Sequence, residues 1–329
     1  MSSSPGAGYK LRPNKAVDRE LFLSLLTRLS SPLNIETYQY IGLGGPFLED
    51  FRMIHTRVGI GKMVCIDNDK QTHLRQKFNK PIDSVDCIHD TLENYIEETE
   101  IEVPTILWLD YTNPKDLQVQ IEMFAQQVTE LPINSILRIT LNANPSSLGK
   151  PNLEDISVNF EDEKTSPHLP SEQEWRLDRF KERMAEYCPA DAKPEDMTQK
   201  NYGKTLLQVL ELSAEKAISQ SVNRKLIWCF TSLYSDGQFM VTATVIIVNS
   251  SEVEISKHIE NWEYKSDPRS PHVIDLPSIS TLERLIMESS SDPKAKLGYE
   301  LPESLMKNNP FETFKKYYRV FPHFSRVEV

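Results

Sequence analysis

The stretch Tyr38-Gln-Tyr-Ile-Gly-Leu-Gly-Gly-Pro46 joins a predicted strand to a predicted helix and holds the densest group of glycines in the chain. Glycine is otherwise scarce, with 11 residues in 329. Gly42, Gly44 and Gly45 stand at a strand-to-helix turn, where open α/β sheets bind ligands and a backbone without side chains can approach them closely. No third glycine follows at the spacing of a dinucleotide fingerprint, so the loop favours a nucleoside or amino-acid moiety over a phosphate. A tight turn without a ligand is the alternative.

A regular alternation of strands and helices extends outward from this loop. It predicts right-handed crossovers and a mostly parallel sheet. A hairpin follows, with Asp236-Gly237 as its turn. We therefore expect an α/β, Rossmann-like fold with a seven-stranded sheet that ends in an antiparallel hairpin. The predicted strands cover residues 38–43, 62–66, 84–88, 105–109, 135–141, 225–234 and 239–248, and the helices between the first five cover 46–58, 69–78, 91–98 and 114–130.

The rest of the chain divides into a lead, an insertion and an extension. Residues 1–35 read as a mobile lead (1–14) and a helix that ends before Pro32, and residues 36–249 form the main domain, with an insertion at about 144–202. Residues 250–329 form a mixed extension. Capping boxes at 171–174 and 280–283 predict two helix starts, and Asn309-Pro310 predicts a third.

Composition and charge exclude several classes of protein. The net charge of −11 disfavours a broad nucleic-acid surface. No apolar run approaches the roughly 20 residues of a membrane span, and the first residues lack the apolar core of a secretory signal. The four cysteines are far apart, which favours free thiols over a zinc site. We expect a cytoplasmic protein with no membrane contact.

Acidic residues follow the second and third predicted strands. Asp67 ends the second strand, where a carboxylate can accept both ribose hydroxyls of a nucleoside. Asn68 is its neighbour, and Asp69 can instead cap the next helix. His89 and Asp90 follow the third strand, where an acid can accept from the exocyclic amine of adenine; a helix cap is an equal alternative for Asp90. These positions predict one nucleoside pocket together with the glycine loop.

Polar residues also end the fourth and fifth predicted strands, and we take them as candidate catalytic groups. Asp110 is placed to act as a general base or as an acceptor that orients a substrate. Tyr111 can stack on adenine or substrate. Asn142 and Asn144 lie at the end of the neighbouring fifth strand. The alternative is that these side chains make only turn hydrogen bonds.

This combination of glycine loop and acids resembles the class I S-adenosylmethionine-dependent methyltransferases, over residues 36–248. Four segments are similar, more narrowly, to a bacterial family described as putative O-methyltransferase. The resemblance implies S-adenosylmethionine as cofactor, bound by Gly42, Leu43, Gly44, Gly45, Asp67, Asn68, His89, Asp90 and Asp110. The four segments are residues 12–19 (Arg-Pro-Asn-Lys-Ala-Val-Asp-Arg), 44–50, 109–113 and 141–145.

The resemblance also has implications for a bound metal ion and for the atom that accepts the methyl group. Asp110 with Asn142 or Asn144 partly imitates the magnesium site of catechol-type O-methyltransferases, but one carboxylate and two amides make a weak site for a hard cation. Methyltransferases of DNA amines carry Asp/Asn-Pro-Pro-aromatic after the fourth strand, whereas this chain has Asp110-Tyr-Thr-Asn-Pro114. We therefore expect no metal and disfavour DNA amine methylation.

The leading hypothesis is methyl transfer to an oxygen of an unidentified small-molecule or protein substrate. A second is a methyltransferase-fold binding subunit with weak or no catalysis, within a multi-protein system such as a bacterial defence system. It arises because Tyr40 and Ile41 stand where many methyltransferases carry an acid before the first glycine. A DNA or RNA methyltransferase is a lesser alternative. A protein partner or a homo-oligomer is left open.

Overall fold

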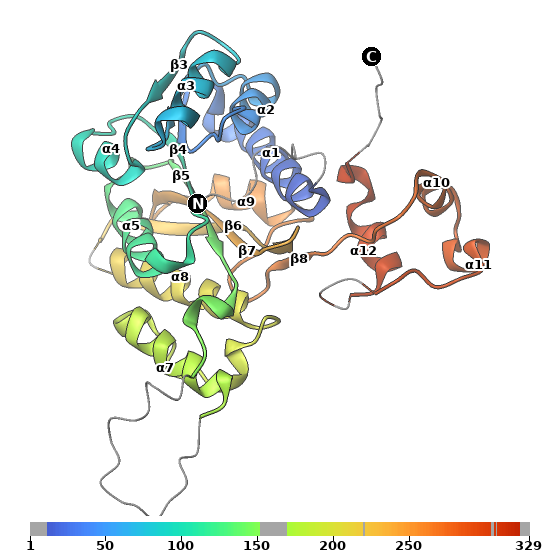
Figure 1. Cartoon of the computed structure of the whole chain (residues 1–329). Coiled ribbons are helices and arrows are strands. Elements are labelled where there is room, and N and C mark those ends of the chain that lie inside the picture. The colour runs from blue at the N-terminus through green and yellow to red at the C-terminus, as the bar shows by residue number, and fades with distance from the viewer. Residues whose placement is uncertain (1–11, 152–169, 220, 304–305, 307, 323–329) are drawn as a thin grey trace, which may run out of the picture.

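The computed structural model describes residues 12–151, 170–219, 221–303, 306 and 308–322, and these form a helix-covered sheet of eight strands (Figure 1). The strand order is β3-β2-β1-β4-β5-β7-β6-β8. The strands are β1 (Gln39–Gly42), β2 (Lys62–Ile66), β3 (Val85–Ile88), β4 (Thr105–Asp110), β5 (Ile136–Asn142), β6 (Arg224–Ser235), β7 (Phe239–Asn249) and β8 (His272–Ile274).

The sheet confirms the predicted fold class and adds one strand. β1 to β5 pair in parallel, and β7 lies antiparallel between β5 and β6. β8, from the predicted extension, pairs in parallel with β6. β8 was not predicted, because three residues are too few for a periodic pattern. The sheet therefore extends beyond the boundary predicted at residue 249.

Helices cover both faces of the sheet and bury a separate apolar core on each. On one face lie α1 (Pro13–Leu33), α2 (Glu49–Val58), α9 (Glu254–Glu260) and α12 (Pro310–Tyr317), and on the other lie α4 (Leu92–Glu98), α5 (Leu117–Glu130), α7 (Glu172–Met184) and α8 (Tyr202–Ile218). α3 (Lys70–Asn79) follows β2, and α10 (Thr281–Ser289) and α11 (Pro293–Leu297) extend away from the sheet (Figure 1). Short 3-10 helices lie at Ile35–Thr37, Pro114–Asp116, Pro145–Leu148, Ala185–Tyr187, Pro194–Met197 and Tyr318–Val320.

Two predicted helix boundaries are wrong for local reasons. α1 contains Pro32, because a proline in the last turn removes a single backbone donor while Leu29 and Leu33 still pack in the core. α2 begins at Glu49 and not at Pro46, because Leu48 has a φ of 51° and cannot continue a right-handed helix. Leu48 is fully buried, so packing holds it in this backbone conformation.

Other local predictions are confirmed. The capping boxes of Ser171 and Ser280 begin α7 and α10, and Asn309 caps α12 with Pro310 in its first turn. The cysteines are free thiols. In the parts of the chain that the structure describes, no helix combines the length and apolar character needed to cross a membrane.

Candidate active site at the carboxyl edge of the sheet

The predicted site residues gather at one edge of the sheet, because neighbouring parallel strands end together. Gly42 pairs with Trp108 and Asp110 with Thr140 in register. The backbone N–H of Asp67 donates to the carbonyl of Ile88 at 3.2 Å, which joins the ends of β2 and β3. This edge is where ligands bind in open α/β sheets.

Gly44 and Gly45 in the loop are glycines for different physical reasons. A Cβ on Gly44 would lie 2.3 Å from Leu48 Cδ2 and 2.9 Å from Cys65 Sγ, so packing within the protein demands glycine there. Gly45 has a φ of 54°, and no atom of the described residues lies within 4 Å of the position of its Cβ. Gly45 is therefore the glycine of this loop that leaves open space for a ligand.

Asp67 and Asp69 separate into two roles. Asp69 is exposed and caps α3, where its carboxylate accepts from the Thr72 N–H at 2.8 Å. Asp67 is half-buried; Oδ1 accepts from the Asp69 N–H at 2.9 Å, and Oδ2 accepts from Gln76 Nε2 at 3.2 Å. Burial raises the pKa of Asp67. Each oxygen of this oriented carboxylate has a further lone pair for a ligand hydroxyl.

His89 and Asp90 follow β3 as predicted, but the cap of α4 is Thr91, whose hydroxyl accepts from the Asn94 N–H. Asp90 Oδ1 accepts from the Thr91 N–H at 2.7 Å and from Asn94 Nδ2 at 3.2 Å. His89 is exposed, and its Nε2 lies 3.2 Å from the carbonyl of Asn68. This contact joins the loops after β2 and β3, at the part of the sheet edge where we predict that the nucleoside binds.

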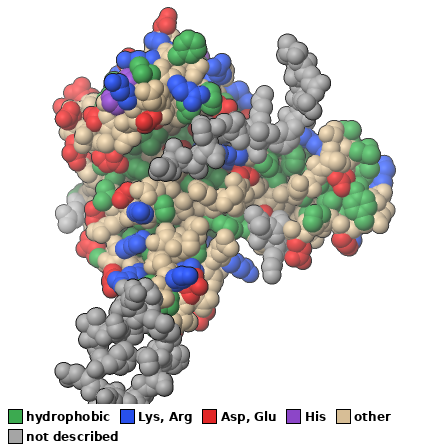
Figure 2. All heavy atoms as spheres, viewed as in Figure 1, with side chains coloured by type: hydrophobic (Ala, Val, Ile, Leu, Met, Phe, Trp, Pro, Cys, Tyr) green, Lys and Arg blue, Asp and Glu red, His purple; other side chains and the backbone are tan. Residues whose placement is uncertain are grey.

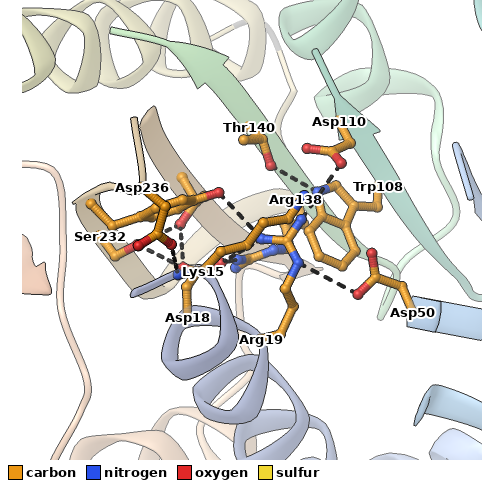
Figure 3. Close-up of polar contacts among 12 residues, drawn as sticks. Lys15, Asp18, Arg19, Asp50, Trp108, Asp110, Arg138, Thr140, Ser232 and Asp236 are labelled. Carbon is orange, nitrogen blue, oxygen red and sulfur yellow. Dashed lines mark hydrogen bonds and ion pairs between the residues drawn. The ribbon is translucent and has the colours of Figure 1, made fainter. Parts of the chain in front are cut away.

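Asp110 is the partly exposed carboxylate at the end of β4, and a buried arginine holds it (Figure 3). Arg19 Nη2 lies 3.6 Å from Asp110 Oδ2, and Arg19 Nε lies 3.5 Å from Asp50 Oδ1. The Arg19 side chain is 1% exposed, whereas that of Asp110 is 17% exposed. Arg19 therefore links the carboxylate at the edge to the helix that follows the glycine loop.

A second ion pair lies behind the first one. Arg138 Nη2 donates to Asp18 Oδ2 at 2.6 Å, and both side chains are fully buried. Ser232 and Thr242 donate to Asp18 Oδ1 at 2.6 and 3.0 Å. Burial acts to raise the pKa of Asp18, but the charges of Arg138 and Arg19 and the hydrogen bond from Ser232 outweigh it and leave that pKa below its ordinary value.

Hydrogen bonds hold the first turn of α1 against the same edge of the sheet. Asn14 Nδ2 donates to the Ser235 carbonyl at 2.8 Å, and its Oδ1 accepts from the Leu276 N–H at 2.8 Å. The N–H of Lys15 donates to Asp236 Oδ2 at 2.7 Å in the turn between β6 and β7. Burial, followed by the charge of Arg19, lowers the pKa of Lys15.

The sequence pattern did not predict this part of the site: residues 1–14 read as a mobile lead, of which residues 1–11 lie outside the part of the chain that the structure describes. A signal was present: Asp18 and Arg19 stand between Val17 and Leu21, which are both core residues. Adjacent opposite charges within an apolar helix face predict a buried ion pair with the sheet.

The other predicted catalytic residues take part mainly in local structure. Tyr111 is 8% exposed and packs in the core beneath α4 and α5; burial, followed by the charge of Glu93, raises the pKa of its phenol. Asn142 donates to the Thr112 carbonyl at 3.1 Å and accepts from the Asn144 N–H at 3.0 Å. Asn144 caps the 3-10 helix that begins at Pro145.

The predicted partial magnesium set does not fit a hard cation. Asp110 faces the guanidinium of Arg19, and the amide oxygens of Asn142 and Asn144 accept backbone N–H groups. Across the described ranges, no three His, Cys, Asp or Glu side chains are grouped so as to hold a metal ion.

Comparisons with known proteins come from a family model and from solved structures; no curated protein matches. The chain is similar to Trm1 from Pyrococcus horikoshii in complex with S-adenosyl-L-methionine (11% identity, 75% of this chain and 57% of that one, TM-score 0.47). It is also similar to the plantazolicin methyltransferase BamL in complex with SAH (13% identity, 72% and 87% covered, TM-score 0.36). The model of the family described as putative O-methyltransferase matches residues 7–329. Since that match spans nearly the whole chain, the protein belongs to this family.

Proposed function

We propose that this protein transfers the methyl group of S-adenosyl-L-methionine to an oxygen atom of a small-molecule or protein substrate. Its family places it among the methyltransferases. The observation that carries the proposal is Asp110: a partly exposed carboxylate at the end of β4, oriented by the buried Arg19 beside the open glycine loop. Such a carboxylate can accept the proton of a hydroxyl group.

The residues at the edge fit the cofactor. The open space at Gly45 admits a ligand against the backbone, and the half-buried carboxylate of Asp67 suits two vicinal hydroxyls. Asp90 Oδ2, next to the loop of Asp67, is available for an adenine amine. When bound, S-adenosylmethionine supplies a methyl group activated by a sulfonium.

Asp110 and Arg19 then have distinct roles in the transfer. The glycine loop, Asp67 and Asp90 would hold the cofactor, which would supply its methyl group to the acceptor oxygen while the electron pair of the carbon–sulfur bond stays on sulfur. The hydroxyl proton passes to Asp110, and general-base assistance of this kind contributes about 10² to 10⁴ in rate. Arg19 is a positioning residue, because it contacts Asp110 and Asp50 from within the core.

Cofactor binding is tested by calorimetry with a matched pair of variants. We expect Asp67→Asn to weaken S-adenosylmethionine binding by about tenfold or more, because the amide retains one acceptor in place of two charged ones. Asp69→Asn should change affinity little, since asparagine caps a helix as well as aspartate does. Absence of binding to the wild-type protein at millimolar cofactor would favour the binding-subunit hypothesis.

Transfer is tested with isotopically labelled S-adenosylmethionine and cell extract fractions. Asp110→Asn should bind the cofactor as the wild type does and lose methyl transfer by about 10²-fold or more. The ¹³C shift of the transferred methyl group identifies the acceptor atom. Wild-type turnover in this variant would remove Asp110 from the mechanism, and a product methylated on nitrogen would contradict the oxygen assignment.

A further inference from the structure

A cavity of about 440 Å³ opens beside the candidate catalytic edge. Its floor is apolar and is formed by Ala143 at the end of β5, Leu233 and Met240 in the hairpin, and Val273 in β8. Its volume lies in the range of small-molecule sites, and an apolar lining with a few polar groups is typical of them.

Gly203 explains how the cavity is formed. A Cβ on this residue would lie 2.6 Å from Leu233 Cδ2 and 3.5 Å from the Cβ of Ala143, so glycine lets the first turn of α8 approach the sheet closely. Lys200 precedes this turn and Lys204 lies within it, and both line the cavity.

The charge of the cavity is opposite to that of the molecule. The chain carries a net charge of −11, yet the described residues that line the cavity include these two lysines and no Asp or Glu. Both lysines are exposed, and neither forms an ion pair with any described residue. Figure 2 shows Lys and Arg side chains over the lower part of the body, where Figure 1 places α7 and α8, and acidic side chains over α4.

The cavity also lies within reach of Asp110. Thr140 is the register partner of Asp110, and Ala143 follows Thr140 by three residues, directly after the last residue of β5. At about 3.3 Å per residue, the backbone of Ala143 lies roughly 10 Å farther along the strand direction than that of Thr140. Ala143 and α8 belong to the core on one face and α1, which holds Arg19, to the core on the other, so a molecule that contacts both the lysines and Asp110 extends over the carboxyl edge of the sheet.

We propose that this cavity binds the methyl acceptor, and that the acceptor is a small molecule with an apolar or aromatic body and an anionic group. Lys200 and Lys204 bind the anion, the apolar floor binds the body, and the acceptor hydroxyl points toward Asp110. This inference rests on the proposed function for the identity of the ligand as substrate, whereas the binding preference of the cavity is independent of it.

The test uses two fluorescent probes that differ in one group. 8-Anilinonaphthalene-1-sulfonate carries a sulfonate, and N-phenyl-1-naphthylamine has the same rings without it. In the double variant Lys200→Gln/Lys204→Gln we expect about tenfold weaker binding of the sulfonate probe, because two charge-assisted contacts are lost. Binding of the neutral probe should be unchanged. Val273→Trp should weaken both probes by filling the cavity.

Controls separate this proposal from the proposed function. The double variant Lys257→Gln/Lys265→Gln, whose lysines pair with Glu254 and Glu260, should bind both probes as the wild type does. S-adenosylmethionine affinity, measured in every variant, should stay unchanged. Equal effects of Lys200→Gln/Lys204→Gln on both probes, or no effect of Val273→Trp on either, overturns the cavity proposal even if the cofactor binds. Failure of cofactor binding with the expected probe results overturns only the proposed function.

Discussion

At the carboxyl edge of the sheet, residues of the same type that lie close together in the sequence have different roles. Gly44 is required by Leu48 and Cys65, whereas Gly45 faces open space. Asp69 caps a helix and Asp67 presents a half-buried carboxylate. In both pairs the sequence shows two residues of one type, and only their surroundings assign the roles.

The glycine pair gives a prediction on stability and binding. Gly44→Ala should destabilise the fold by about 1–3 kcal/mol, because the new methyl group overlaps three packed side chains. Gly45→Ala should cost about 1 kcal/mol, from the positive φ alone, but should weaken cofactor binding. Urea unfolding and calorimetry measure the two effects. Equal stability losses with unchanged affinity would show that Gly45 serves only the turn.

At the scale of elements, α1 does more than cover the sheet. Its residues Asp18 and Arg19 complete a buried charge network between β4, β5 and β6. Arg138 also lies 4.7 Å from the centroid of the Trp108 ring, and Arg19 lies 4.8 Å from it. Side chains of α1 therefore form the buried surface behind Asp110.

Removing the charge of Asp18 tests this network. Asp18→Asn should lower the free energy of unfolding by about 3–5 kcal/mol at neutral pH, because Arg138 is left buried without its counter-ion. Ser232→Ala, which removes one hydrogen bond to the same carboxylate, should cost about 1 kcal/mol. Urea titrations measure both, and wild-type stability of Asp18→Asn would refute the role.

The stabilising effect of Asp18 should decrease at acidic pH. The pKa of Asp18 in the folded protein lies below the ordinary value of 3.8. Its stabilising effect is therefore complete above about pH 4 and is lost as the pH falls further, through the folded pKa. Asp18→Asn should lose less stability than the wild type over that acidic range.

At the scale of the whole molecule, the C-terminal segment is part of the apolar core that α1 covers. Phe314, Tyr317 and Phe321 are buried. His272 in β8 is also buried; its Nε2 lies 3.0 Å from the Tyr264 carbonyl and its Nδ1 lies 3.4 Å from the Tyr317 hydroxyl. Burial, followed by the charge of Lys316, lowers the pKa of His272 from 6.5 to about 4.

His272 should make the fold sensitive to mild acid. Between pH 6.5 and 4 the unfolded chain binds a proton that the folded protein does not, so stability falls as pH falls through this window. From pH 7 to pH 5 we expect the wild type to lose about 2 kcal/mol more than His272→Gln. His89→Gln, at an exposed position, should lose as much as the wild type. Parallel losses in His272→Gln and the wild type would contradict the expectation.

The sequence by itself determined the order of strands and helices, the hairpin, several helix caps and the positions of the glycine loop and the acids. These follow from short-range periodicity and turn chemistry, which a single segment encodes. The tertiary structure alone decided which carboxylates share Arg19, which glycine faces open space, that β8 joins the sheet, and that a cationic cavity lies beside β5. Each of these depends on contacts between segments far apart in the chain, such as Asp18 with Arg138 and Gly203 with Leu233. The local sequence pattern does not encode these contacts, because they form only when the helices pack on the sheet.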